Sequence, residues 1–104
     1  MDGSMVETLR KLVEKNPGNA LGRFGLANEY MKLGMYEEAI EQIKEYLKIK
    51  DDEGAVYRML AEACLRLGRV DEARQAYELG ISAALKHGHP SMAEEFEEAL
   101  ESLK

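Results

Sequence analysis

Two histidines are the first residues in this sequence whose types and spacing suggest a metal site. His87 and His89 are separated by one glycine and followed by Pro90. At that spacing a helix cannot direct both rings from one face, and no cysteine or third histidine lies nearby to complete a zinc site. We therefore interpret this stretch as a surface turn.

Three consecutive acidic residues, Asp51, Asp52 and Glu53, form a second candidate site. Neighbouring carboxylates can bind a metal ion or act as an acid and a base, but the glycine-bearing spacing of a calcium loop is absent. Unpaired N–H groups and the positive end of the helix dipole favour carboxylates where a helix begins. We expect these residues to cap the helix that follows them.

The single cysteine, Cys64, is the remaining reactive side chain to consider. It lies among apolar helix positions, which favours a buried thiol over a reactive one, and one cysteine cannot form an internal disulfide. The sequence shows no nucleophile paired with a base and no glycine-rich phosphate loop. We predict a protein without catalytic residues, metal or cofactor, and hence not an enzyme.

The composition excludes several classes of partner. The 104 residues carry a formal net charge of −6, and 45% of them are hydrophobic. The basic residues form no cluster that could bind a phosphate backbone, so nucleic acid is not an expected partner. No apolar run approaches the roughly 20 residues of a membrane span, and the N-terminus lacks the pattern of an export signal. We expect no membrane partner and a cytoplasmic protein of one domain.

A ten-residue stretch that occurs twice organises the rest of the chain. Tyr30 to Ala39 (YMKLGMYEEA) and Cys64 to Ala73 (CLRLGRVDEA) are 34 residues apart, and each indicates a helix end, a tight turn at glycine and a new helix start. A unit of this kind is stable only when it is stacked on another. The same spacing pairs Leu26 with Leu60, Ala27 with Ala61, Leu33 with Leu67, Gly34 with Gly68, Ala39 with Ala73 and Ile43 with Tyr77.

This spacing, with these residue types, resembles the tetratricopeptide repeat family. The first repeat supplies Leu26, Ala27, Tyr30, Gly34, Tyr36, Ala39 and Ile43, and the second supplies Tyr57, Leu60, Ala61, Gly68, Ala73 and Tyr77. The sequence departs from the family pattern at three places, where Arg23 replaces an aromatic residue, Cys64 a tyrosine and Tyr46 a small residue. In addition, neither repeat closes on proline.

The resemblance implies an all-α fold, a right-handed α-solenoid of antiparallel helix pairs with about six helices. We expect residues 1–4 to be a disordered start that lies outside the domain. The single domain, residues 5–104, then consists of an N-terminal capping helix (5–16), repeat one (19–52), repeat two (53–88) and a C-terminal capping helix (90–104).

Local signals set the expected helix boundaries. Asn19 is the expected cap of a helix from Ala20 to Leu33, and Ser91 that of the last helix. Gly80 lies inside the second helix of repeat two, where glycine costs about 1 kcal/mol relative to alanine. The family has a small residue there so that neighbouring helices approach closely. The first helix has one apolar face, formed by Met5, Val6, Leu9, Leu12 and Val13.

In the family, the first helices of successive repeats line a concave groove. Stacking the pattern places there Leu21, Phe24, Asn28, Met31 and Lys32 from repeat one and Ala55, Arg58, Glu62, Leu65 and Arg66 from repeat two. The resemblance implies a non-catalytic protein–protein interaction module that binds a peptide or helix of another protein. We expect Leu21 and Phe24 to anchor this segment and Arg58 and Arg66 to orient it. The opposing interpretation is that neighbouring helices cover Leu21 and Phe24. A different function with the same fold is a self-assembling, homo-oligomeric scaffold or regulatory subunit that uses its terminal helices.

Overall fold

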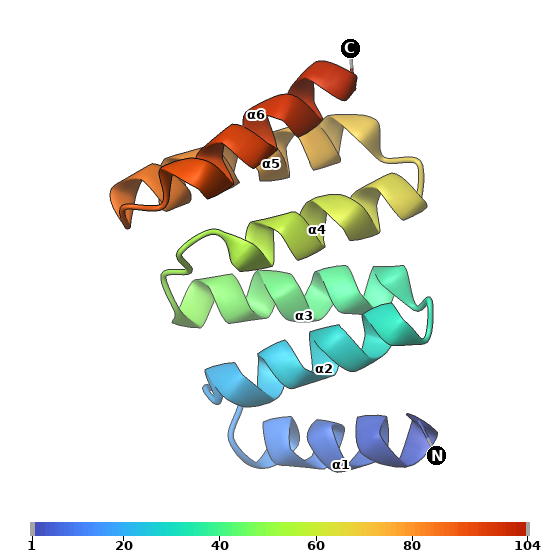
Figure 1. The fold of residues 1–104 in the computed structure, drawn as a ribbon. Helices are drawn as coiled ribbons and strands as arrows, with labels where there is room; N and C mark the ends of the chain where they lie inside the picture. Colours follow the sequence, from blue (N-terminus) through green and yellow to red (C-terminus); the bar gives the residue numbers. More distant parts are fainter. Residues whose placement is uncertain (1, 104) are drawn as a thin grey trace. The chain divides into compact units, whose positions relative to one another are not determined.

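The computed structural model describes residues 2–103, with side chains described from residue 5 to residue 103. These residues are all-α and form six helices, as predicted: α1 (Asp2–Lys15), α2 (Ala20–Lys32), α3 (Tyr36–Ile49), α4 (Ala55–Arg66), α5 (Val70–Lys86) and α6 (Pro90–Ser102) (Figure 1). The chain divides between Asp51 and Asp52 into two compact units. We call α1 to α3 the first unit and α4 to α6 the second unit; in each, consecutive helices pack against one another.

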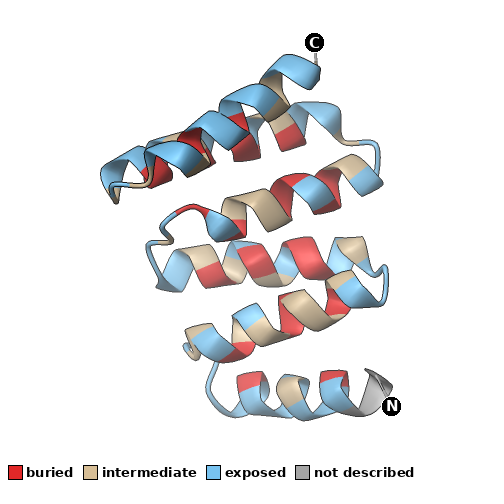
Figure 2. Ribbon diagram, in the orientation of Figure 1, coloured by how far each residue is buried: buried red, intermediate tan, exposed pale blue. Residues whose placement is uncertain are grey.

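The first unit is held together by an apolar cluster that draws on all three helices. Val6, Val13, Leu26, Tyr30 and Ala39 form this cluster, and the partly buried Leu9 and Met31 pack against it. Burying a large aliphatic or aromatic side chain stabilises a fold by about 1.5–3 kcal/mol, so these contacts outweigh the weak surface ion pairs of the same helices. Figure 2 shows the buried positions of α2 and α3 as short bands separated by intermediate and exposed stretches of the helices.

The two repeat glycines form equivalent turns. The φ angles of Gly34 and Gly68 are +73° and +75°, in the left-handed region that glycine adopts without a Cβ clash. The N–H that follows each glycine donates to a carbonyl five residues earlier, from Met35 to Tyr30 at 2.8 Å and from Arg69 to Cys64 at 2.9 Å. The two helices therefore end in the same way, as the repeated stretch predicted.

The second unit is built around Phe96 of α6, which is completely buried. Its ring lies 5.6 Å from the ring of Tyr77 in α5, centroid to centroid. Gly80 leaves room for it, because a Cβ at that position would lie 2.7 Å from a ring carbon of Phe96. The expected close approach of helices at Gly80 is confirmed, and the side chain that fills the space comes from α6.

Polar contacts also fix α6 at its two ends and in its middle. His89, which precedes α6, lies 2.6 Å from a carboxylate oxygen of Glu53. At the other end, the guanidinium of Arg74 in α5 donates to the backbone carbonyl of Leu103 at 3.2 Å. Between them, Arg58 of α4 pairs with Glu95. These contacts make α6 an integral part of the second unit.

The helix starts differ in part from the expected ones. The carbonyl oxygen of the Asn19 side chain accepts the N–H of Gly22 at 3.0 Å, so this cap is confirmed. Ser91 does not cap α6, because the helix already begins at Pro90, whose fixed φ and missing N–H suit the first helical turn. At the other end of the chain, α1 begins at Asp2 and includes residues 2–4, which we expected to lie outside the helix, whereas Met1 is outside the described residues.

Of the three acidic residues before α4, Asp52 makes the capping hydrogen bonds. One oxygen of its carboxylate accepts the N–H groups of Gly54 and Val56 at 2.8 and 2.9 Å. Glu53 instead pairs with His89. The sequence therefore predicted the capping role of this stretch, but did not separate the residue that caps from the one that reaches α6.

Candidate interaction surface

In the first unit, α2 has one face that the other helices of the unit cover only in part. Leu26, Ala27 and Tyr30 are buried, whereas Leu21 is 81% exposed and Lys32 is also exposed. Asn28 is half-buried between them. The offsets from Leu21, of seven and eleven residues, bring these positions onto one side of a helix.

Phe24 lies on the same face and rests against α3. The residue is 37% exposed, and its ring centroid lies 5.9 Å from that of Tyr46, with the rings tilted by 49°. Because such aromatic pairs favour particular ring orientations, the contact with Tyr46 restrains Phe24, whose exposed part adds apolar surface one turn from Leu21. Large side chains held in place lose little conformational entropy when they contact a partner.

Two other predicted binding residues of the first unit also make contacts within that unit. Met31 is partly buried and packs against the core cluster. The ammonium of Lys32 lies 3.1 Å from a carboxylate oxygen of Glu29 on the preceding turn. An exposed pair of this kind is worth about 0.5 kcal/mol, so it does not prevent Lys32 from meeting another carboxylate.

In the second unit, the predicted orienting residue Arg58 is engaged within the fold. Its guanidinium makes two hydrogen bonds to the carboxylate of Glu95, at 2.5 and 2.7 Å, and lies 5.5 Å from the ring centroid of Phe96. The hydrogen bonds raise the pKa of Arg58 and lower the pKa of Glu95 below its usual range. Arg58 thus connects α4 to α6, a role that its place in the repeat did not indicate.

The other predicted residues of α4 form a polar strip. Ala55, Glu62 and Arg66 are exposed, and Leu65 is half-buried. The pKa of the Tyr77 hydroxyl is raised, mainly by burial and to a smaller extent by the negative charge of nearby Glu62. Compared with α2, the face of α4 therefore offers charge and little exposed apolar surface.

The side chains considered above as reactive or metal-binding groups are buried or paired within the fold. Cys64 is 1% exposed in the core of α4, and His89 pairs with Glu53. Among the side chains of residues 5–103, no group of three or more His, Cys, Asp or Glu residues is close enough to hold a metal ion. No helix in this described part of the chain is long and apolar enough to cross a membrane.

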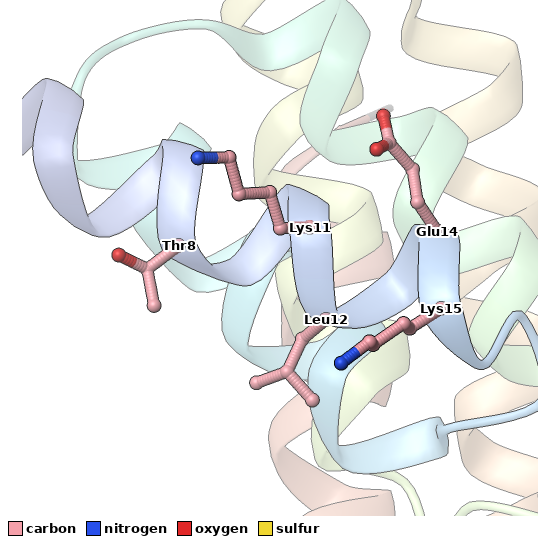
Figure 3. A pocket seen from close by; sticks show the side chains of 5 residues that line it. All are labelled: Thr8, Lys11, Leu12, Glu14 and Lys15. Carbon is pink, nitrogen blue, oxygen red and sulfur yellow. The ribbon is translucent and has the colours of Figure 1, made fainter.

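A hollow on α1 was not predicted from the sequence. It measures about 650 Å³ and is lined by Thr8, Lys11, Leu12, Glu14 and Lys15, all from this one helix (Figure 3). We expected Leu12 on the packed face, but its side chain is 44% exposed. The signal in the sequence was the width of the apolar pattern, which covers more of the helix circumference than α2 can contact.

Comparison with known proteins supports the repeat organisation that the equivalent turns at Gly34 and Gly68 indicate. The tetratricopeptide repeat family matches residues 6–54 and 24–90. The chain belongs to this family. Members are generally protein–protein interaction modules and typically non-catalytic. The tetratricopeptide repeat (TPR) assignment made from the sequence is thereby confirmed.

Two curated TPR proteins are similar in sequence. TPR repeat-containing protein PA0015 of Pseudomonas aeruginosa is 36% identical over 84 residues, which cover 81% of this chain and 80% of that protein. Small glutamine-rich tetratricopeptide repeat-containing protein 2 of Mycosarcoma maydis is 30% identical over 79 residues, 76% of this chain but only 22% of that protein. The chain thus spans about a fifth of the second relative.

A solved structure supports the fold. The solution structure of protein BPP2914 from Bordetella parapertussis matches with a TM-score of 0.79 at 24% sequence identity. The match covers 95% of this chain and 86% of that one. At this level of identity the likeness concerns the TPR fold alone.

Proposed function

We propose that the protein binds a peptide or helical segment of a partner protein through the partly open face of α2. Leu21 and Phe24 are the apolar anchors, and Asn28 and Lys32 supply a hydrogen-bonding amide and a positive charge one and two turns further along. A segment with a large apolar side chain followed by a carboxylate complements this order of groups.

The observation that carries the proposal is the exposure of Leu21. A leucine with 81% of its surface in water gains nothing from the fold, and it lies one turn from the partly exposed ring of Phe24. Single exposed leucines are common on protein surfaces, so the proposal depends on Leu21 and the neighbouring ring of Phe24 together, which form a continuous exposed apolar surface. The general role of TPR proteins in protein–protein interaction agrees with this use.

The residues of α4 have a secondary place in the proposal. Within the second unit, Glu62, Leu65 and Arg66 are the candidates on this helix for contact with a partner protein. Arg58 serves only in part, because a partner carboxylate that approaches it must compete with the two hydrogen bonds to Glu95. We therefore assign the anchoring role to α2 in the first unit and, separately, a selecting role to the charges of α4 in the second unit.

The test compares capture of partner proteins by two immobilised variants with capture by the wild type, using lysate from the source organism and quantitative mass spectrometry. Leu21→Glu should remove the specifically captured protein, because it places a charge where an apolar side chain must be buried. The matched control is Leu79→Glu, which changes a leucine of α5 that is 55% exposed. Capture that survives Leu21→Glu, or is lost equally in both variants, contradicts the proposal.

Self-assembly through the terminal helices stays a prediction. The outward side of α6 carries Ser91, Glu94, Glu98 and Glu101, which are all exposed and polar. A contact through this side would bury carboxylates without burying apolar surface, which disfavours a tight association. Sedimentation velocity over a range of concentrations decides the question, since a protein that stays monomeric throughout is not a homo-oligomeric scaffold.

A further inference from the structure

The helix α1 has one broad apolar face, and only part of it packs against α2. Val6 and Val13 belong to the core of the first unit, and Leu9 packs against it. Met5 and Leu12, seven residues and about two turns apart, lie beside that part but are 50% and 44% exposed. An apolar strip about two turns long is therefore left open along the helix.

Two lysines flank this strip. Lys11 and Lys15 are one turn apart and line the same hollow as Leu12. Neither has a carboxylate within ion-pair distance in residues 5–103, whereas the neighbouring Arg10 pairs with Glu7 on the same helix. Figure 3 shows the acidic Glu14 pointing away from Lys15. Two lysines and one glutamate line the hollow, so the charge beside the open strip is net positive.

We propose that this face of α1, formed by Met5, Thr8, Lys11, Leu12 and Lys15, is a second docking surface that binds an amphipathic helix of a partner protein. The apolar side of that helix covers Met5 and Leu12, and its carboxylates meet Lys11 and Lys15. A helix fits because the apolar and the basic positions each recur at helical spacing, so a second helix alongside meets both sets together. The surface is on a different helix from the α2 face proposed above and does not depend on it.

A second copy of this chain is a poorer occupant. Its α6 has the matching negative charge, but the outward stripe of that helix presents only serine and glutamate side chains. The exposed ion pairs that would result contribute little, and Met5 and Leu12 would gain no apolar contact. The complementary partner is therefore a helix that presents both leucine-like side chains and carboxylates.

The test uses two synthetic helical peptides and the full chain. Both peptides carry leucines at a spacing of three and four residues; one has glutamates along the flank and the other has lysines at the same places. Titration of the isotope-labelled protein, followed by NMR, should show saturable shifts of the amides from Thr8 to Lys15 with the glutamate peptide, and binding of the lysine peptide should be at least about fivefold weaker. The variant Lys11→Glu/Lys15→Glu should reverse this preference.

Two control variants show whether peptide binding depends on this face of α1. Lys44→Glu/Lys50→Glu makes the same change in net charge on exposed positions outside α1 and should leave both affinities unchanged. Leu21→Glu, which disables the proposed α2 face, should also leave peptide binding to α1 unchanged. The proposal is overturned if the shifts centre on α2 or if the two peptides bind equally well. It is also overturned if millimolar peptide causes no saturable shift. Concentration-dependent self-association that disappears in Lys11→Glu/Lys15→Glu would overturn it as well, because this result assigns the surface to a second copy.

Discussion

Replacing Gly80 with alanine should destabilise the protein, although alanine is the better helix former. Gly80 lies inside α5, where the exchange alone would stabilise the helix by about 1 kcal/mol. The added Cβ, however, would lie 2.7 and 2.8 Å from two ring carbons of Phe96 and 3.0 Å from the Cβ of Tyr57. Atoms do not approach this closely, so either the ring or the helix must move.

The ring has little freedom to move. Phe96 is completely buried, and its ring contacts both the ring of Tyr77 and the guanidinium of Arg58. Overpacking of a filled core costs about 1–3 kcal/mol, and two ring contacts plus one Cβ contact place this case in the upper half of that range. After subtracting the helix gain of about 1 kcal/mol, we expect Gly80→Ala to lower the free energy of unfolding by about 1–2 kcal/mol.

Urea unfolding followed by circular dichroism measures this difference, and Gly25→Ala is the matched control. A Cβ at Gly25 would meet only the methyl groups of Leu9, at 3.3 and 3.5 Å, and that side chain can adjust. Gly25→Ala should therefore stabilise the protein by up to about 1 kcal/mol. In the background of Phe96→Leu, which shortens the obstructing side chain, Gly80→Ala should lose most of its cost. If Gly80→Ala stabilises the protein as Gly25→Ala does, or costs as much in the Phe96→Leu background as in the wild type, the packing argument is wrong.

Three further substitutions test the contacts that define the fold. Glu95→Gln should lower the free energy of unfolding by at most about 1 kcal/mol at neutral pH. The pKa of Glu95 is lowered from its ordinary value of 4.5. The stability difference between the variant and the wild type should therefore persist above pH 4.5 and disappear as the pH falls below it. Asp52→Ala removes the acceptor of two N–H groups at the start of α4 and should cost about 1 kcal/mol in urea unfolding, whereas an unchanged midpoint excludes a capping role. Gly68→Ala should lower the free energy of unfolding by about 1–2 kcal/mol. This cost comes from the φ of +75° alone, because no atom lies within 4 Å of the new methyl group. A change near zero would mean that the turn is not fixed in this conformation.

The repeated units were predictable from the sequence because their signals are local. A glycine at the same place in two copies of one stretch requires the same backbone angle, and the apolar positions around it are fixed by the helical period. Gly34 and Gly68 accordingly adopt matching φ angles, and Leu26 and Ala61 are buried as expected. Neither conclusion needed knowledge of how distant segments meet.

The roles of Arg58 and Gly80 depend on such distant contacts. Arg58 lies 37 residues before Glu95, and only the packing of α6 through Phe96 brings the two side chains together. At Gly80 the sequence indicated a close approach but not the residue that makes it; the position 34 residues earlier is Tyr46, so the repeat itself does not demand glycine. Glycine is needed at this position because α6 packs there.

The open strip on α1 could not be predicted for a related reason. The periodicity of the sequence gives the direction of an apolar face but not how much of it a neighbouring helix covers. Val13 lies against Gly22 of α2, whereas Leu12, one residue earlier, projects into solvent. The boundary between packed and open surface is set by the contact of two helices, which the pattern of one helix does not contain.

Methyl NMR of the chain tests most directly whether α2 presents the side chains that anchor a partner. Leucine and methionine methyl groups would be labelled and observed while a peptide from the captured partner is added. We expect the methyl groups of Leu21 and Met31 to shift and saturate with the peptide, while those of Leu79 and Leu85 on α5 do not. Saturable shifts at Leu79 and Leu85 with Leu21 unchanged would contradict an anchoring role for α2.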